Sequence, residues 1–342
     1  MPKTLLLLFA TVPLFMMGCD NTNTAEKPDA KPVSQSTSAS GSSGVAENPD
    51  ANSDSMEPVE VSRGSANEPN PAMGNPATKS DSAAVALQPN KDVAFSLKFL
   101  SWNVESDGSD PQTIAKELSE LGSYDIIALT EVLPQSAKDF CEAFGDEFNY
   151  VMSDTGRNDR LVLVYNSQAI RFVKKFELHD INFKSKYRSP LVVHFQDILT
   201  GKEMLVMVNH LARGNAETRQ IQATKLVDWA RDQTMPTVAL GDYNFDFEFD
   251  TREGNESFRL FMKDSVWKWV EPIELIDTNW YDNPDEPDGK DDYPGSMLDF
   301  AFVAGPAKDW TTSCKVIVRE GDFPDDEKTS DHRPYEVIVS GQ

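Results

Sequence analysis

The chain has 342 residues, of which 39% are hydrophobic, 26% are charged and three are cysteines, and its formal charge is −24 at pH 7. This composition excludes a disulfide-dense mini-protein, a collagen-like chain and a polytopic membrane protein. None of the 33 aromatic residues lies between residues 20 and 92, whereas 31 lie between 93 and 342. We therefore expect one compact domain over residues 93–342.

The expected domain is strongly acidic. Residues 93–342 carry 26 basic and 45 acidic side chains, which gives a formal charge of −19. Broad electrostatic binding to nucleic acid or to anionic lipid requires an excess of basic side chains, so this charge argues against it. Bound metal ions and local arginines can still support weak binding of a phosphate-containing substrate.

The first 19 residues have the pattern of an export signal. Lys3 precedes the apolar run from Leu5 to Met17, which is too short to span ~30 Å of hydrocarbon comfortably. The following Gly18-Cys19 pair resembles a bacterial lipobox, in which the cysteine is acylated and becomes the new N-terminus. This implies an exported protein, periplasmic or extracellular, that is anchored to a membrane of the cell envelope at Cys19. The alternative is an ordinary cleaved signal peptide with an incidental cysteine.

Residues 20–92 are predicted to be a disordered linker. They are rich in Ser, Asn, Pro, Ala and Glu and show neither strand-like nor helical periodicity. Such a segment cannot bury enough apolar surface to offset its chain entropy. We expect a flexible tether between the anchor and the domain.

The domain begins with a predicted β-α-β unit. Residues Ser96–Val104 alternate like a strand, Pro111–Leu121 have helical spacing, and Tyr124–Leu129 form a short buried run. Helical spacing recurs near Ala216–Arg231 and Glu256–Met262. Further strand-like runs are Leu161–Tyr165, Leu191–Phe195, Met204–Val208, Thr237–Leu240, Leu298–Val303, Lys315–Val318 and Tyr335–Val339. Many strands with few helices predict two sheets packed face to face with the helices outside.

Polar side chains follow or end several of these predicted strands. Rigid strands can position carboxylates and imidazoles at one end of a sandwich, so this pattern is typical of a site. Oxygen ligands without cysteine favour Mg²⁺, Mn²⁺ or Ca²⁺ over structural zinc. The residues concerned are Asn103, Glu105, Glu131, His210, Asp242, Asn244, Asp299, Asp331 and His332.

The order of the short motifs is more specific than any one of them. Along the chain come Trp-Asn-x-Glu, a glutamate that ends a strand, Asn-His-Leu, Gly-Asp-Tyr-Asn, Leu-Asp-Phe and Ser-Asp-His. In this order they resemble the endonuclease/exonuclease/phosphatase superfamily, the deoxyribonuclease I-like fold, over residues 95–340. The resemblance implies an α+β fold, in which two mixed β-sheets flanked by helices form a four-layered α/β/β/α sandwich.

The resemblance also implies a metal site. Asn103 and Glu131 would hold the first divalent cation with help from Asp331, and Glu105 occupies the place where the family often has a second acidic residue. The expected cation is Mg²⁺ or Mn²⁺, with Ca²⁺ as a further option. A divalent cation suits the chemistry because a phosphodiester is anionic and resists nucleophilic attack.

The remaining motif residues would act on the phosphate. By the same resemblance, His210 hydrogen-bonds a phosphate oxygen and Asn244 stabilises the phosphorane-like transition state. Asp242 orients or deprotonates the attacking water, and His332, held by Asp299, faces the phosphate. An imidazole paired with a carboxylate serves as a base or as a cationic phosphate clamp. We assign His332 and Asp242 jointly to water activation.

Arginines near the expected site are candidates for substrate contacts. Arg213 follows His210 by three residues, and Arg188 lies on a segment that leads into the same region. Either guanidinium could contact substrate phosphates. The alternative is ordinary surface ion pairing in a domain with many carboxylates.

Three functions remain open at this stage. The leading hypothesis is a divalent-metal-dependent phosphodiester hydrolase, a secreted or envelope-tethered nuclease that acts as a monomer on nucleic acid. The second is a phosphoesterase for a small or lipid phosphate ester, with sphingomyelinase-like or sugar-phosphate phosphatase activity. The third is a non-catalytic surface lipoprotein, which the complete set of acids and imidazoles makes the weakest.

Overall fold

The computed structural model describes residues 93–106, 108–182, 186–324 and 328–341. The predicted signal peptide at 1–19, the predicted acylation site Cys19 and the whole of the predicted linker at 20–92 lie outside the described residues. Within the described part of the chain, no helix is both long enough and apolar enough to cross a membrane.

The first sheet contains both chain ends of the domain. Its strands follow the order β11-β12-β1-β2-β4-β3. Their bounds are Phe95–Asn103 for β1, Ile126–Val132 for β2, Phe148–Met152 for β3, Arg160–Asn166 for β4, Thr311–Val316 for β11 and Tyr335–Gly341 for β12. Strands β1 and β2 are parallel, and the other pairs are antiparallel, so the sheet is mixed.

The second sheet is built on the same plan. Its strands follow the order β5-β6-β7-β8-β10-β9. Their bounds are Ile170–Glu177 for β5, Leu191–Asp197 for β6, Glu203–His210 for β7, Thr237–Glu248 for β8, Trp267–Trp269 for β9 and Ser296–Ala304 for β10. Only β7 and β8 run parallel, as β1 and β2 do in the first sheet.

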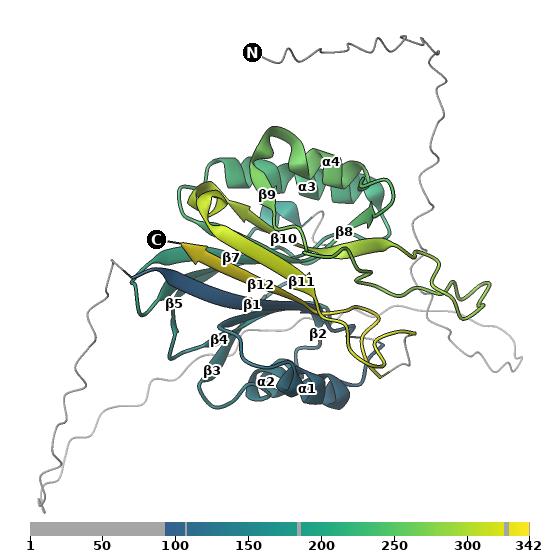
Figure 1. Cartoon of the computed structure of the whole chain (residues 1–342), viewed down its shortest axis with the longest axis horizontal. Coiled ribbons are helices and arrows are strands. Elements are labelled where there is room, and N and C mark those ends of the chain that lie inside the picture. Colours follow the sequence, from purple (N-terminus) through teal and green to yellow (C-terminus); the bar gives the residue numbers. More distant parts are fainter. Residues whose placement is uncertain (1–92, 107, 183–185, 325–327, 342) are drawn as a thin grey trace, which may run out of the picture. The chain divides into compact units, whose positions relative to one another are not determined.

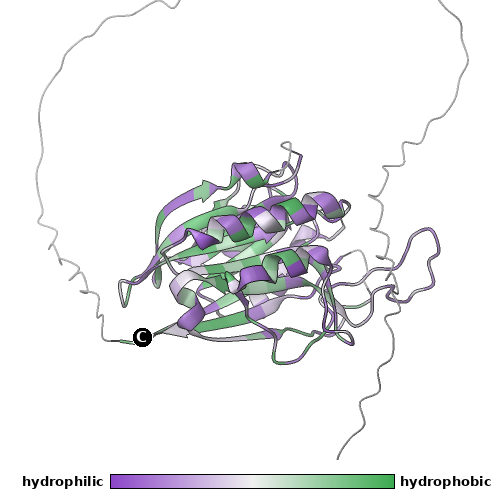
Figure 2. Cartoon of the chain, turned by 90° about the horizontal axis from the view of Figure 1, so that it is seen from above, coloured by the Kyte–Doolittle hydropathy of each residue, from purple (hydrophilic) through white to green (hydrophobic). Residues whose placement is uncertain are grey.

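Helices cover the outer face of each sheet. Helices α1 (Pro111–Glu120) and α2 (Ala137–Glu142) pack on the first sheet, and α3 (Ala216–Arg231) and α4 (Glu256–Met262) pack on the second (Figure 1). The strands are mostly hydrophobic, and the helices combine hydrophilic and hydrophobic residues (Figure 2). The predicted four-layered α/β/β/α sandwich is therefore confirmed.

Side chains that alternate along the strands build three apolar layers. In β1, Phe95, Leu97 and Phe99 face the second sheet, whereas Leu100 and Trp102 face α1 and α2. All five are at most 2% exposed, and burying each such side chain stabilises the fold by about 1.5–3 kcal/mol. The period of two residues thus places successive side chains in different layers.

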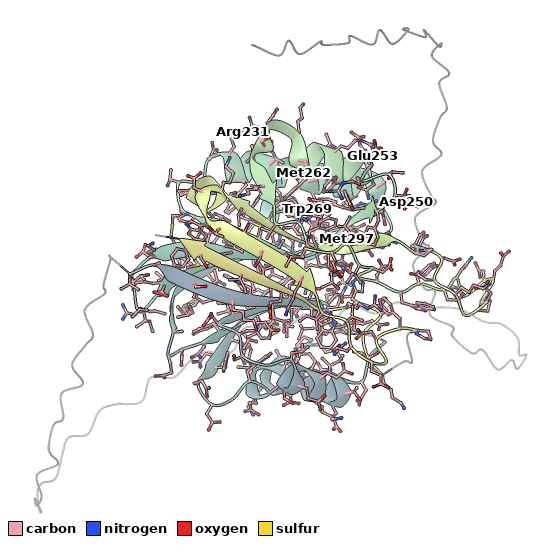
Figure 3. All side chains as sticks on the ribbon, viewed as in Figure 1. Arg231, Asp250, Glu253, Met262, Trp269 and Met297 are labelled. Atoms are coloured by element: carbon pink, nitrogen blue, oxygen red, sulfur yellow. The ribbon has the colours of Figure 1, made fainter. Side chains whose placement is uncertain are left out.

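Aromatic rings fill the layer between the second sheet and its helices. Tyr243 contacts Phe261, Phe300 and Phe302 in edge-on or tilted geometries, with ring centroids 5.0–6.1 Å apart. Trp269, on β9, lies beneath α4 (Figure 3) and its ring is 4.8 Å from that of Phe247. The tryptophans of β9 pack in the core, and they are no platform for bases.

The sequence analysis placed some elements wrongly or missed them. The strand predicted to end at Leu240 continues to Glu248, because Gly241 lies within β8 and does not make a turn. The last strand before β12 occupies Thr311–Val316, earlier than the predicted Lys315–Val318. Strands β3 and β5 were missed because their side chains are largely exposed and give no alternating apolar signal.

Two buried cysteines lie in the described part of the chain. Cys141 belongs to α2 and Cys314 to β11, and both are free thiols. They therefore form no disulfide with each other.

Candidate active site

The site lies where the carboxyl ends of the two parallel strand pairs meet. Asn103 ends β1, Glu131 lies near the end of β2 and His210 ends β7. Asp242 pairs with His210 in the β7–β8 register. A hydrogen bond of 3.2 Å from Asn103 Nδ2 to Asp242 Oδ2 joins the two sheets at this point. Each parallel pair thus places its polar residues at the same end of the sandwich.

Two carboxylates and an imidazole form the centre of the site. Among the described residues, Glu131, His210 and Asp242 have donor atoms that all lie within 4.8 Å of one another. His210 Nε2 is 3.6 Å from Glu131 Oε1 and 3.5 Å from Asp242 Oδ2. Asn103 Nδ2 also donates to Glu131 Oε1 at 3.0 Å. Four residues from four strands therefore converge on one small volume.

A second imidazole faces the same carboxylate. His332 Nε2 is 4.0 Å from Asp242 Oδ2, and its Nδ1 donates to Asp299 Oδ2 at 2.7 Å. Burial alone would lower the pKa of His332, but the negative charges of Asp299, Asp331 and Asp242 outweigh it and raise that pKa well above its ordinary value. The Asp299 hydrogen bond fixes the ring so that Nε2 points to the centre of the site.

The loop that carries His332 is fastened to β1. Ser330 Oγ donates to Asn103 O at 2.6 Å, and Asp331 N donates to Glu105 Oε2 at 3.1 Å. Trp102 Nε1 donates to His332 O at 2.8 Å. Glu105 therefore positions the backbone of Asp331, and the side chain of Asp331 lies 3.8 Å from His332 Nε2.

Several site residues have strained backbones. Glu105, Glu131 and Asn244 have φ of 48°, 55° and 52°, in the left-handed region that non-glycine residues rarely adopt. Such conformations cost on the order of 1–3 kcal/mol each and cluster at functional sites. The strained backbone at Asn244 directs its own N–H to Asp242 Oδ1 at 2.9 Å, and this hydrogen bond fixes the orientation of the Asp242 carboxylate.

The structure adds a residue that the sequence analysis missed. Asp159 Oδ1 lies 3.4 Å from His210 Nδ1, and its Oδ2 pairs with Arg188 Nη1 at 2.6 Å. Burial alone would raise the pKa of Asp159, but the charges of Arg188 and His210 lower it to about 2. Asp159 directly precedes the antiparallel strand β4, whose start lies at the same edge as the end of β2. A search for polar residues at strand starts as well as strand ends would have found it.

Both arginines predicted to bind substrate have acidic partners. Arg188 pairs with Asp159, and Arg213 pairs with Asp246 of β8 while its guanidinium lies 5.5 Å from the ring centroid of Tyr293. Arg188 therefore borders the site directly, whereas Arg213, in the segment between β7 and α3, pairs with a residue of β8 four positions beyond Asp242. Their substrate contacts stay predictions.

Comparison with known proteins identifies the family. The model of the Endonuclease/Exonuclease/phosphatase family matches residues 100–332, which include every site residue described above. The chain belongs to this family. Among curated proteins, no significant match is found.

Solved structures of this family share the fold at low identity. A family member from Bacteroides thetaiotaomicron is 18% identical, with a TM-score of 0.56, and the match covers 73% of this chain and 96% of that one. TDP2 from D. rerio complexed with a single-strand DNA product is 15% identical, with a TM-score of 0.57 and coverage of 72% and 99%. A mannosyl-6-phosphatase from B. thetaiotaomicron VPI-5482 is 19% identical, with a TM-score of 0.54 and coverage of 71% and 99%.

The donor set of this family member fits a divalent cation. Within the described residues, neither Glu131 nor Asp242 forms an ion pair with lysine or arginine, although their oxygens face each other. Adjacent carboxylates repel each other unless a cation lies between them, and hard divalent cations prefer such oxygen ligands. The predicted metal residues were Asn103, Glu105, Glu131 and Asp331, and only Glu131 among them also belongs to the Glu131–His210–Asp242 group. Metal binding is therefore expected to depend most on Glu131.

One further residue holds the site in register. Tyr335 of β12 accepts a hydrogen bond from Gly241 N at 2.8 Å and donates to Phe300 O, although it belongs to the opposite sheet. Gly241 precedes Asp242, and Phe300 follows Asp299. A single hydroxyl therefore connects the sheets directly beneath two predicted catalytic carboxylates.

We expect Tyr335→Phe to reduce turnover by about 10-fold, because small displacements of reacting groups are costly. The two backbone groups it leaves unpaired should also lower the free energy of unfolding by about 1–3 kcal/mol. Turnover and urea unfolding are measured beside Tyr124→Phe, which removes another buried hydroxyl, one that contacts Glu336 away from the site. Equal turnover in both variants would show that Tyr335 has no positioning role.

Proposed function

We propose that this protein is a divalent-metal-dependent phosphodiesterase that hydrolyses nucleic acid. Membership of the family supports action on phosphate esters, and the nuclease activity is our inference. The observation that carries it is the convergence of His210 and His332 on one oxygen of Asp242, beside Glu131 and Asn103. Two imidazoles and a carboxylate around one point can hold an anionic phosphate and activate a water molecule.

We assign each side chain a task in this proposal. Glu131, Asn103 and Asp331 would hold the cation, which when bound neutralises phosphate oxygens and stabilises the leaving oxyanion. Asp242 accepts the proton of the attacking water, and His332 takes part through the Nε2 that Asp299 leaves free. These roles require no movement of the strands, because every group already lies at the same edge.

His210 and Asn244 complete the proposed mechanism. Asp159 orients the ring of His210, whose Nε2 faces the centre and can donate to a phosphate oxygen. Asn244 is held by its donation to Leu211 O at 3.1 Å, which places its amide beside Asp242. Both groups would bind the phosphate in its transition state more tightly than in its ground state, which is the condition for catalysis.

An aromatic pair beside the site supports nucleic acid as the substrate. The rings of Tyr281 and Tyr293 stack with centroids 5.4 Å apart, and Arg213 lies over Tyr293. Arg213 pairs with Asp246, which accepts a hydrogen bond from Asn255, and Asn255 donates to Asn244 O. Aromatic and guanidinium planes are surfaces on which unpaired bases stack.

The test is a substrate panel. Purified protein is incubated with single-stranded DNA, plasmid DNA, RNA, a chromogenic bis-ester, a chromogenic monoester, mannose 6-phosphate and sphingomyelin, each with Mg²⁺, Mn²⁺, Ca²⁺ or a chelator. We expect metal-dependent cleavage of DNA or RNA and of the bis-ester. Turnover confined to the monoester, the sugar phosphate or the lipid would contradict the nuclease proposal.

A small phosphate ester is the second candidate. The formal charge of −19 for residues 93–342 disfavours a long polyanion, and the mannosyl-6-phosphatase has the same fold. The same substrate panel distinguishes a phosphomonoesterase from a nuclease, because a phosphomonoesterase would release inorganic phosphate and leave plasmid DNA intact.

We also propose that the protein is exported and anchored to a membrane. They rest on the sequence of residues 1–92 alone, in which Cys19 would carry the lipid and residues 20–92 would give the domain its reach. Mass spectrometry of membrane fractions should find an acylated N-terminal Cys19. A soluble protein whose N-terminus lies elsewhere would contradict the anchor.

A further inference from the structure

A pocket of about 390 Å³ adjoins the site and contains most of the nearby cationic side chains. It lies between the segment 154–160, which leads from β3 into β4, and residues of the connection from β5 to β6. Its charged walls comprise Arg157, Arg160, Lys186, Arg188, Asp154 and Asp159. We propose that this pocket binds a second phosphate group of the substrate, next to the one that is cleaved. The inference rests on the proposed nuclease function, which it deepens.

The charge of the pocket is opposite to that of its surroundings. Asp159 is paired with Arg188, and Asp154 is paired with Lys175 at 2.9 Å. In the described part of the chain, Arg157, Arg160 and Lys186 have no carboxylate partner. Three cations without an ion-pair partner therefore line one pocket of a domain that carries an excess of 19 negative charges, although Arg160 lies near enough to Asp154 to help lower the pKa of that carboxyl after Lys175. Such a local concentration of positive charge attracts an anion despite the net charge.

The pocket shares a wall with the catalytic centre. Asp159 contacts His210 on one side and Arg188 on the other, at 3.4 Å and 2.6 Å. Arg188 Nη2 donates to Leu211 O at 3.4 Å, immediately after His210. Its Nε is buried and has no hydrogen-bond partner. A buried unpaired donor is unfavourable, and an oxygen of a phosphate is the strongest acceptor that a guanidinium meets.

The loop around the pocket is already fixed in shape. Arg160 donates from Nε to Arg157 O at 2.7 Å and from Nη1 to Ser153 O at 2.9 Å. Gly156 has a φ of 103°, and a Cβ at this position would lie 2.1 Å from Asp159 O, so only glycine fits the turn. A preorganised loop loses little entropy when an anion binds.

The arrangement selects the class of ligand. Arg188 in the pocket wall pairs with Asp159, and Asp159 contacts the predicted catalytic imidazole of His210. A second phosphate that follows the scissile phosphate along a polynucleotide can reach a pocket this close to the site. The ring of Tyr187 lies beside Lys186, whose Nζ is 5.4 Å from the ring centroid, and offers a face for the intervening base. A monoester or a lipid with a single phosphate would leave the pocket without a ligand.

The test compares dinucleotides with and without an additional phosphate. Thymidine dinucleotide is assayed unmodified, with a 5′-phosphate and with a 3′-phosphate, using the full chain and the double variant Arg157→Ala/Lys186→Ala. We expect one phosphorylated form to have a KM about 10-fold below that of the unmodified form, the effect of one charge-assisted hydrogen bond. In the double variant this ratio should approach one. Lys263→Ala/Lys268→Ala removes the same charge from an exposed surface elsewhere and should keep the ratio.

A binding measurement separates this inference from the proposed function. Inorganic pyrophosphate is titrated calorimetrically into each protein in the presence of a chelator, and its affinity should be about 10-fold weaker in the Arg157→Ala/Lys186→Ala variant. If no dinucleotide is cleaved, this titration alone decides the pocket, and the substrate panel above decides the nuclease proposal. Equal pyrophosphate affinities in the two double variants, or an unchanged KM ratio, would overturn the second phosphate site.

Discussion

Replacement of Asp242 by asparagine is expected to lower turnover by about 10²-fold or more without unfolding the protein. Its Oδ2 lies 3.2 Å from Asn103 Nδ2, 3.5 Å from His210 Nε2 and 4.0 Å from His332 Nε2. The amide has the same shape but cannot take a proton from water and carries no charge to attract the imidazoles. The loss should appear in kcat for the chromogenic bis-ester.

The matched control is Asp250→Asn, which changes an exposed aspartate just after β8 (Figure 3). It should leave kcat and the urea midpoint close to those of the unchanged protein. His332→Ala should cost about as much as Asp242→Asn, and the double variant should lose little more than either, because residues that act as a unit are not additive. Near-normal turnover in both single variants would remove their assignment to water activation.

The fold was predictable where one or both faces of a strand are buried. Strand β1 alternates between two apolar layers, so its sequence gives a period of two, and the apolar runs of β6 and β7 are equally clear. Strand β5 lies at the edge of its sheet beside β6, and most of its side chains are exposed. Its sequence therefore lacks the alternating apolar residues that would predict a strand. The alternation of apolar and polar residues along a strand reflects which side chains are buried, and a strand at the edge of a sheet buries few of them.

The continuation of β8 shows a different limit. Gly241 has a φ of 129°, and a Cβ there would lie 2.0 Å from Asn209 O on the neighbouring strand. The glycine is required by this close approach of β7 and β8, whereas the predicted strand ended just before it at Leu240. Glycine signals an unusual backbone, and only the structure shows which kind.

For the site, the sequence supplied the residue types and the structure supplied their grouping. The carboxyl ends of parallel strands lie at the same edge of a sheet, so polar residues there come together. The group formed by Asn103, Glu131, His210 and Asp242 could be expected for this reason. Asp159 was missed because it precedes an antiparallel strand, and the role of Tyr335 was missed because this residue lies at the start of a strand and its hydroxyl reaches backbone groups of the other sheet. Both omissions concern residues that support the site through other residues.

Glu131→Gln is the second substitution with a large expected effect. Glu131 belongs both to the predicted ligand set and to the observed group with His210 and Asp242. Loss of supporting residues around a metal typically costs 10–100-fold in affinity, so loss of a ligand should cost at least about 10²-fold. Affinity for Mn²⁺ is measured by calorimetry and turnover at saturating Mn²⁺, with Glu253→Gln as the control on an exposed loop. Unchanged Mn²⁺ affinity in Glu131→Gln would exclude this carboxylate as a ligand.

The location of the cation is the most direct test of the account. Crystals of the protein soaked in Mn²⁺ should give one anomalous peak in contact with a Glu131 oxygen, within the space bounded by Asn103, Asp242, Asp331 and His332. The same soak of Glu131→Gln crystals should abolish or strongly weaken the peak. A peak that forms elsewhere in the domain, or no peak at this edge of the sandwich in the unchanged protein, would contradict a metal-dependent hydrolase built on these residues.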